Sequence, residues 1–171
     1  AAKLDVVVVN PTYMLGPLDA RPSSGQMIIG VVKGELPGFP GGGNNFVDVR
    51  DVCRGMILAW HRGRRGQRYI LGGRDMQYGD AMRLFAKVAG VKPPRWNIPA
   101  PLAKGLGFVG SLKERLTGTE SQLSTLKIRY AYCTGYRFRS DKAIRELGYT
   151  ISPLEPAVAD AIAWFRKNGM L

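Results

Sequence analysis

The sequence of 171 residues contains few histidines and cysteines, two residue types that often carry catalysis. It has one histidine and two cysteines, Cys53 and Cys133, which lie far apart. The absence of a Cys-x-x-Cys pair excludes a zinc knuckle and a thioredoxin-type redox site. Unpaired cysteines are the default in a reducing compartment, so we expect a cytoplasmic protein, with one Cys53–Cys133 bridge as the alternative. His61 is followed by Arg62, Arg64 and Arg65 and is interpreted as a solvated side chain, not a base.

Several other signals are also missing. No apolar run approaches the ~18 residues of a membrane-spanning helix, so we expect no membrane partner. No Gly-Lys dipeptide exists, which excludes a P-loop, and no His-Glu-x-x-His or calcium-loop pattern supports a metal site. Gly105-x-Gly107-x-x-Gly110 matches the dinucleotide fingerprint by letter. It follows prolines and not a strand, so we interpret it as a helix softened by glycine.

Acidic residues are scarce. There are 13 of them against 25 lysines and arginines, which gives a net charge of +12. Between Arg50 and Arg74 seven arginines accompany a single acidic residue, Asp51. Two interpretations are open: a patch that binds phosphate, or a solvated helix end whose cations complement the helix dipole. We favour the second because aromatic residues do not alternate with the arginines, and we do not expect nucleic acid as a partner.

What the sequence does contain is an alternation of short apolar and amphipathic segments, which is typical of an α/β protein. Strands are predicted at 4–9, 46–49, 69–71 and 136–138. Helices are predicted from Ser23 or Ser24 as cap to Gly34, from Asp51 as cap or leading residue to Gly63, over 82–89, 102–116 and 121–132, from Ser140 as cap to Gly148, and over 153–168. Residues 36–45 and the proline-rich segment around Trp96 are predicted to be loops.

The segment Val6–Val9 is the most apolar of the predicted strands. Four consecutive valines favour a parallel strand that is buried on both faces. The other predicted strands are few and short, so this one lacks convincing neighbours. Because the sequence also begins with Ala1, we expect it to be part of a longer protein.

The most informative segment follows that strand and reads Asn10-Pro11-Thr12-Tyr13-Met14-Leu15-Gly16-Pro17. It places polar groups at the carboxyl end of a strand, which is the edge where α/β sheets bind ligands. A plain strand exit is the alternative.

Four motifs, in this order, resemble the extended short-chain dehydrogenase/reductase superfamily, also called the NAD-dependent epimerase/dehydratases. Within it the sequence looks closest to dihydroflavonol-4-reductase-like proteins and hopanoid-associated sugar epimerases. The motifs are Val9–Thr12 with Gly16–Pro17, Asn45–Val52, Arg68–Gly73, and Ser140–Ala143 with Glu146–Tyr149.

The resemblance implies the C-terminal part of a Rossmann-like parallel sheet with a mostly helical substrate-binding cap. The implied segments are a strand and nicotinamide-side loop at 1–17, a cap segment at 18–45, the return to the sheet at 46–90, the cap at 91–139 and the C-terminal helices at 140–171. It also implies a small-molecule substrate, NAD or NADP as cofactor, and a full-length protein that can form a homodimer.

The family's Gly-rich motif and its Tyr-x-x-x-Lys pair would lie upstream, since none of the seven tyrosines has a lysine four residues later. We therefore expect no catalytic residue here and an inactive fragment. By resemblance, the cofactor-binding candidates are Asn10, Pro11, Thr12 and Ser24, and the substrate-binding candidates are Tyr13, Ser23, Met27, Asn45 and Phe46.

Two positions depart from the nucleotide-sugar epimerases, which often have an arginine at Asn44 and a histidine or tyrosine at Asp48. These departures weaken the assignment of a nucleotide-diphosphate sugar and leave a reductase of a small carbonyl compound open. The resulting hypothesis is the substrate-binding half of an NAD(P)-dependent oxidoreductase or epimerase. The alternative is a non-catalytic module that binds an acidic partner through residues Arg50–Arg74.

Overall fold

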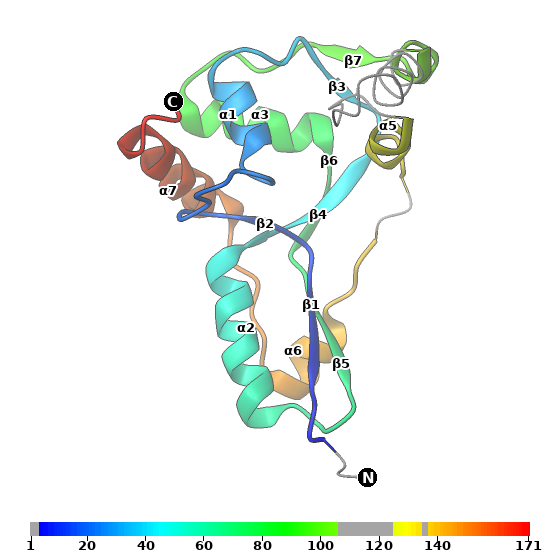
Figure 1. Ribbon diagram of the computed structural model, residues 1–171, viewed down its shortest axis with the longest axis vertical. Helices are drawn as coiled ribbons and strands as arrows, with labels where there is room; N and C mark the ends of the chain where they lie inside the picture. The colour runs from blue at the N-terminus through cyan, green and yellow to red at the C-terminus, as the bar shows by residue number, and fades with distance from the viewer. Residues whose placement is uncertain (1–3, 106–124, 135–136) are drawn as a thin grey trace.

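The chain folds into two packed halves that meet where its central strands bend (Figure 1). The computed structural model describes residues 4–105, 125–134 and 137–171. In the half that contains the N-terminus, β1 (Val8–Pro11) pairs in parallel with β5 (Arg68–Leu71). Helices α2 (Val49–Arg62) and α6 (Asp141–Leu147) pack beside this pair. The buried core between them contains Val52, Tyr69 and Leu147.

The second half is built around β4 (Gly43–Asp48), which lies between β2 (Tyr13–Leu15) and β6 (Arg74–Gln77). The pairing is parallel with β2 and antiparallel with β6. Helices α1 (Gln26–Val32), α3 (Tyr78–Ala89) and α7 (Leu154–Lys167) pack together on this sheet, as Figure 1 shows. Phe46, Phe85 and Phe165 are fully buried in the core that they enclose.

A third, two-stranded parallel sheet joins β3 (Gly38–Pro40) to β7 (Trp96–Ile98). It lies at the top of Figure 1, near α5 (Thr125–Ala131). Both strands fall in segments that were predicted to be loops. That prediction was wrong because the two strands stabilise each other across a large sequence separation, which a local pattern of prolines and glycines does not reveal. Strand β6 was missed for a similar reason, because Arg74, Asp75 and Gln77 are polar and the strand depends on β4.

The strand predicted at 4–9 begins later and is not fully buried. β1 starts at Val8 and includes Asn10 and Pro11, and the Val8 side chain is 38% exposed. Within the described residues, β1 hydrogen-bonds to β5 alone, so its other edge is open.

Two of the predicted helix starts differ in detail. Gly25 occupies the cap position of α1, with no side-chain cap. Asp48 caps α2, with Oδ1 accepting a hydrogen bond from the Arg50 backbone N–H at 2.8 Å, and Asp51 lies in the first turn of this helix. Ser140 occupies the cap position of α6, as predicted, although its side chain makes no cap hydrogen bond.

The helix ends at Gly90 and Gly148 are confirmed, because both residues adopt the left-handed conformation that favours glycine, with φ of 71° and 76°. The strand predicted at 136–138 is not found at residues 137 and 138, and residue 136 lies outside the described residues. Helical structure is described at 100–105 and 125–131, and the remainder of the helices predicted at 102–116 and 121–132 lies outside the described residues. Gly107 and Gly110 lie there too.

Candidate functional site

The bend between the two halves places a polar network at the carboxyl end of β1. Thr12 is the single residue between β1 and β2, and Gly72 and Gly73 are the two residues between β5 and β6. β4 passes beside both connections and contributes Asn45. Residues from three distant parts of the sequence therefore meet where parallel strands end.

Asn45 is the centre of this network and is fully buried. Its Oδ1 accepts hydrogen bonds from the Thr12 hydroxyl at 2.8 Å and from the Gly73 backbone N–H at 2.7 Å. Its Nδ2 donates to the Gly73 carbonyl oxygen at 3.3 Å and to Oδ1 of Asp75 at 2.6 Å. Because an amide offers two N–H donors and two acceptor lone pairs, this side chain is saturated by its partners in the chain.

The neighbouring Gly72 is held from the opposite side by Ser140. The Ser140 hydroxyl accepts a hydrogen bond from the Gly72 N–H at 2.9 Å and lies 3.2 Å from the Gly72 carbonyl oxygen, to which it donates. A Cβ on Gly73 would overlap the carbonyl oxygen of Phe46. The Gly72–Gly73 pair is thus needed for close contact with β4 and α6, not for a flexible loop.

Tyr13 connects the end of β1 to the loop before α1. Its hydroxyl donates to the Ser24 carbonyl oxygen at 3.2 Å, and its ring packs edge-on against Phe46, with the ring centroids 5.1 Å apart. Burial, followed by the proximity of Tyr78 and Asp19, raises the pKa of Tyr13 well above its ordinary value. The hydroxyl therefore stays protonated and acts as a donor at neutral pH.

The candidate residues occupy different environments. Asn10 and Pro11 are exposed on β1, and Thr12 is half-buried. The network brings Thr12 to Asn45 and brings Tyr13 to Phe46 and Ser24.

Phe46 and Asn45 are both fully buried. From the interior of the fold, Phe46 packs against the Tyr13 ring and Asn45 accepts the hydrogen bond of the Thr12 hydroxyl. Ser23 is exposed and Met27 packs against the core under α1. Together with Ser24, Gly16 and Cys53, Ser23 lines a mostly apolar pocket of about 370 Å³.

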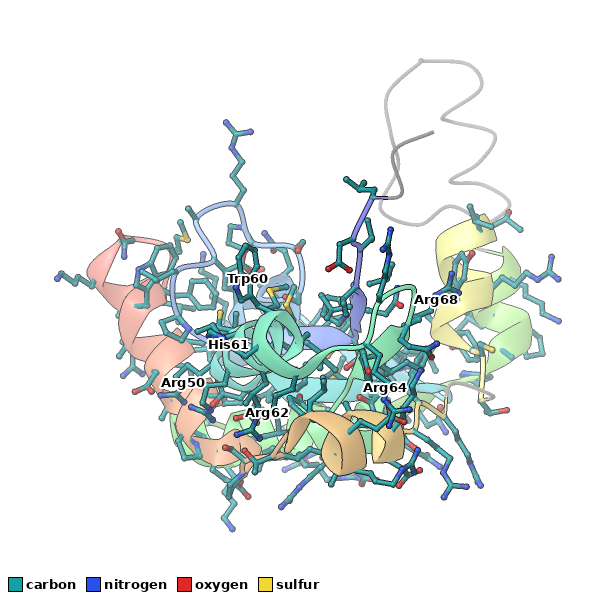
Figure 2. The ribbon with its side chains drawn as sticks, turned by 90° about the horizontal axis from the view of Figure 1, so that it is seen from below. Arg50, Trp60, His61, Arg62, Arg64 and Arg68 are labelled. Atoms are coloured by element: carbon teal, nitrogen blue, oxygen red, sulfur yellow. The ribbon has the colours of Figure 1, made fainter. Side chains whose placement is uncertain are left out.

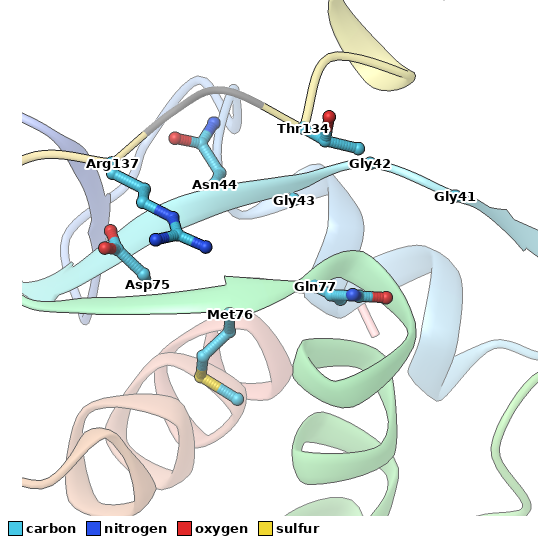
Figure 3. A pocket seen from close by; sticks show the side chains of 9 residues that line it. All are labelled: Gly41, Gly42, Gly43, Asn44, Asp75, Met76, Gln77, Thr134 and Arg137. Atoms are coloured by element: carbon cyan, nitrogen blue, oxygen red, sulfur yellow. The ribbon is translucent and has the colours of Figure 1, made fainter.

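A second pocket, of about 170 Å³, lies between β4, β6 and the chain after α5 (Figure 3). It is lined by three glycines, five polar side chains and one methionine, namely Gly41, Gly42, Gly43, Asn44, Asp75, Met76, Gln77, Thr134 and Arg137. Figure 3 shows Arg137 reaching across β4 toward Asp75. Sequence reasoning missed Asp75, Thr134 and Arg137, although three consecutive glycines did mark the segment. A Cβ on Gly42 would overlap the Ala131 carbonyl oxygen, so the glycines allow close packing of α5.

The arginine-rich segment is not one continuous patch. Figure 2 shows Arg50 and Arg62 on one side of α2, Trp60 projecting from another, and Arg68 on a separate strand. Five of its arginines contact other parts of the chain: Arg50 pairs with Asp48 and Asp160, Arg54 with Asp51, Arg62 with the Leu147 carbonyl oxygen, Arg64 with Glu146, and Arg65 with the Leu4 carbonyl oxygen. These contacts agree with the interpretation of the segment as a set of helix-end and structural cations. His61 is exposed, as predicted.

Two further features of the described residues bear on function. None of their helices is long and apolar enough to cross a membrane. In the same ranges, no cluster of three or more His, Cys, Asp or Glu side chains could hold a metal ion.

No family model matches the sequence. Individual relatives do. The chain is 35% identical over 173 residues to sterol demethylase protein B of Methylococcus capsulatus, covering 98% of this chain and 52% of the relative. It is 31% identical over 170 residues to a putative dihydroflavonol 4-reductase of Synechocystis, covering 96% of this chain and 49% of the relative. The chain thus spans about half the length of the relatives it matches.

A solved structure gives the same result. A nucleoside-diphosphate-sugar epimerase from Pseudomonas aeruginosa superposes with a TM-score of 0.77 at 30% identity, over 98% of this chain and 50% of the epimerase. The sequence resemblance and the α/β fold are therefore both confirmed, and the chain belongs to the extended short-chain dehydrogenase/reductase (NAD-dependent epimerase/dehydratase) superfamily, with dihydroflavonol-reductase-like proteins among its relatives.

Proposed function

We propose that this chain is the substrate-binding half of an NAD(P)-dependent reductase or epimerase that acts on a small carbonyl compound or sugar derivative. The longer protein that contains it, here called the parent polypeptide, would supply the Gly-rich cofactor motif and the Tyr-x-x-x-Lys pair. The observation that carries the proposal is the network of Thr12, Asn45 and Gly73 at the carboxyl end of β1.

This network supports a cofactor-binding role for the end of β1. Crevices at the carboxyl ends of parallel strands are the usual ligand sites of open α/β sheets. Here Asn10 and Pro11 are exposed, while Thr12 is fixed from behind by a saturated buried amide. A rigid, partly exposed edge is what a site needs to hold a planar ring in one orientation. Solved structures that share this fold hold NAD or NADPH.

Ser24 and Ser23 support the assignment of the substrate side. Tyr13 joins the loop that carries them to the end of β1 through the hydrogen bond to the Ser24 carbonyl oxygen. The nicotinamide edge and the loop before α1 are therefore held at a fixed separation. A substrate between them would meet Ser23 and Ser24 from one side and the cofactor from the other.

Two residues favour a small carbonyl substrate over a nucleotide-diphosphate sugar. The diphosphate-binding arginine of the epimerases is replaced by Asn44, whose amide oxygen accepts the Asn45 N–H at 2.8 Å and whose Nδ2 lies 3.5 Å from the Tyr78 hydroxyl. Asp48, at the second departing position, caps α2 and pairs with Arg50. Both side chains are therefore engaged in the fold, and neither brings a positive charge to a diphosphate.

Chemistry at the substrate would depend on groups outside this chain. In the superfamily, the tyrosine of the Tyr-x-x-x-Lys pair exchanges a proton with the substrate oxygen, and the lysine lowers the pKa of that tyrosine. A bound nicotinamide would supply or accept the hydride. The residues of this chain would bind and orient: Pro11 and Thr12 would hold the ring, and Ser23 and Ser24 would hold the substrate. We therefore expect no turnover by the chain alone.

Turnover by the parent polypeptide tests this proposal. Reduction of a panel of small aldehydes and ketones is followed by the loss of NADH or NADPH absorbance. An epimerase returns its hydride in each turnover and leaves no net change in cofactor, so conversion of nucleotide-diphosphate sugars is followed in parallel by chromatography of the sugar products. We expect activity on the carbonyl panel, no conversion of the nucleotide-diphosphate sugars, and no activity from this chain alone. Turnover by the chain alone, or absence of cofactor binding by the parent polypeptide, would overturn the proposal.

A further inference from the structure

The positive charge of the chain is concentrated in one part of the sequence. Residues 81–140 contain eleven lysines and arginines and two glutamates, which leaves +9 of the total charge of +12. The two glutamates, Glu114 and Glu120, lie outside the described residues. The sequence at 81–105 and at 125–140 contains no acidic residue. This excess is larger than that of the arginine-rich segment, whose side chains mostly contact other parts of the chain.

Three of these cations lie at the upper end of the molecule in Figure 1. Lys92 and Arg95 precede β7, and Lys104 lies in the helical segment at 100–105 that follows it. All three residues are exposed. Within the residues that the structure describes, none of the three side chains makes a hydrogen bond or an ion pair. Their charges are therefore available to a partner.

Large apolar side chains are exposed among these cations. Trp96, the first residue of β7, is 75% exposed and stands beside Lys92 and Arg95 at a hollow of about 240 Å³. Leu102 is 59% exposed, whereas the next residue, Ala103, is buried. The helical segment therefore packs on the fold through Ala103 and leaves Leu102 in water. An indole and an isobutyl group thus share one surface with three cations.

The loop before β3 borders the same hollow through Gly34 and Leu36. It carries one acidic residue, Glu35, next to the cation Lys33, and both are exposed. Because these two charges cancel, the surface keeps the positive charge of Lys92, Arg95 and Lys104.

The combination of side chains indicates which partner fits. Cations near an anionic lipid surface are attracted to it, tryptophan is favoured at the level of the lipid headgroups, and leucine gains by entering the acyl boundary. A nucleic acid would also attract the cations and could stack on Trp96, but it would leave Leu102 in water. An anionic bilayer is the partner that uses all three kinds of side chain.

We propose that the surface formed by Lys92, Arg95, Trp96, Leu102 and Lys104, here called the β7 surface, binds an anionic lipid bilayer from one side. Peripheral binding of this kind needs no membrane-spanning helix. The proposal goes beyond the proposed function, and it departs from the expectation of no membrane partner, which rested on the lack of a spanning segment.

Co-sedimentation with lipid vesicles measures this binding. The parent polypeptide is mixed with vesicles of phosphatidylcholine alone and with vesicles that also contain phosphatidylglycerol, at low and at high salt. We expect binding to the phosphatidylglycerol vesicles, much weaker binding to phosphatidylcholine, and a decrease with salt, because salt screens surface charges. Absence of binding to phosphatidylglycerol vesicles at low salt would overturn the proposal.

Two sets of substitutions separate the contributions of charge and of apolar contact. The triple variant Lys92→Gln/Arg95→Gln/Lys104→Gln should weaken binding to phosphatidylglycerol vesicles by about a hundredfold, since each cation near the surface contributes about fivefold. The double variant Trp96→Ala/Leu102→Ala keeps the charge and should weaken the same binding by about tenfold. Circular dichroism verifies folding, which the exposure of these side chains leads us to expect.

Matched controls lie at the opposite end of Figure 1, in the turn before β5 and in α6. Arg64→Gln/Arg65→Gln/Arg68→Gln removes the same number of charges, and Ile144→Ala removes part of a side chain that is 45% exposed. Both should bind vesicles within about twofold of the unaltered protein, a difference well below 1 kcal/mol. If the control triple variant loses as much affinity as the first, the total charge and not the β7 surface is responsible, and the proposal fails.

A second readout does not depend on the multiple variants. Vesicles whose lipids carry bromine on the acyl chains quench tryptophan fluorescence on contact. We expect quenching in the unaltered parent polypeptide and its marked reduction in Trp96→Phe, which keeps an aromatic ring at that position. Equal quenching in both would show that another surface contacts the lipid and would overturn the proposal. So would binding of a DNA oligonucleotide as tight as that of the vesicles and unchanged by Trp96→Ala/Leu102→Ala, because a general polyanion site would then explain the charge.

Discussion

Ser140 provides the sharpest test of how the strand junction is stabilised. Its sequence position before α6 indicates a helix cap, yet its hydroxyl is bonded to both the N–H and the carbonyl oxygen of Gly72. Ser140 is only 6% exposed, so bulk water has little access to its hydroxyl. Replacing Ser140 with Ala leaves a buried N–H without a partner, and we expect the free energy of unfolding to fall by about 1–3 kcal/mol.

Asp distinguishes the two roles of Ser140. As a helix cap, Asp is as good as Ser, so Ser140→Asp would be tolerated if capping were the role. A carboxylate cannot donate to the Gly72 carbonyl oxygen, and burial of an unpaired charge costs several kcal/mol. We therefore expect Ser140→Asp to be more destabilising than Ser140→Ala.

Urea unfolding followed by circular dichroism measures both changes. Ser23→Ala is the matched control, because Ser23 is exposed; it should change stability by less than about 0.5 kcal/mol. If Ser140→Asp unfolds at the same urea concentration as the unaltered protein, the side chain is a cap and the assignment of a buried clamp on Gly72 is wrong.

Three further predictions concern stability. Gly73→Ala should destabilise the fold by about 1–3 kcal/mol, because its Cβ would overlap a carbonyl oxygen of β4. Gly105→Ala, in a helix with free space around it, should stabilise the fold by about 0.5–1 kcal/mol. Thermal melts of the two variants compare these changes. Phe165→Ala should cost about 3–5 kcal/mol, because the ring is fully buried in the core under α7; Phe165→Leu should cost clearly less, and equal losses in urea unfolding would contradict this. Glu146 has a lowered pKa: burial opposes the shift, but the hydrogen bond from Tyr69 and neighbouring positive charges outweigh it. Its stabilising contribution is therefore complete above about pH 4.5 and is lost as the pH falls through the lower pKa of the folded state, so stability measured against pH should decline less steeply in Glu146→Gln.

The sequence predicts well those elements whose pattern is local. Helix α3 shows apolar residues at helical spacing and ends at Gly90, and strand β5 is a short apolar run that follows Arg68 and ends before Gly72. Strands β3, β6 and β7 could not be found in this way, because their residues are polar, proline-rich or glycine-rich and each strand exists through its partner. The exposure of Val8 has a related cause, since burial of a strand depends on which strands lie beside it.

In the candidate site, too, the residues with a local sequence signal were found and those that depend on distant partners were missed. The segment Asn10–Tyr13 was identified from a polar strand end and a resemblance, and the structure brings Thr12 to Asn45 and Tyr13 to Ser24. No sequence signal linked Ser140 to Gly72, because serine before a helix is expected as a cap and gives no sign of a second partner far away in the sequence. Asp75 was missed because an isolated carboxylate on a polar strand has no pattern, and its partner Asn45 lies on a neighbouring strand.

Cofactor titration of the parent polypeptide tests the central claim most directly. NADH and NADPH are added while the fluorescence of the reduced nicotinamide is recorded. We expect saturable binding of at least one of them, with weaker binding when Thr12 is replaced by Val at the end of β1. Absence of saturable binding of both dinucleotides, in a parent polypeptide shown to be folded, would contradict it.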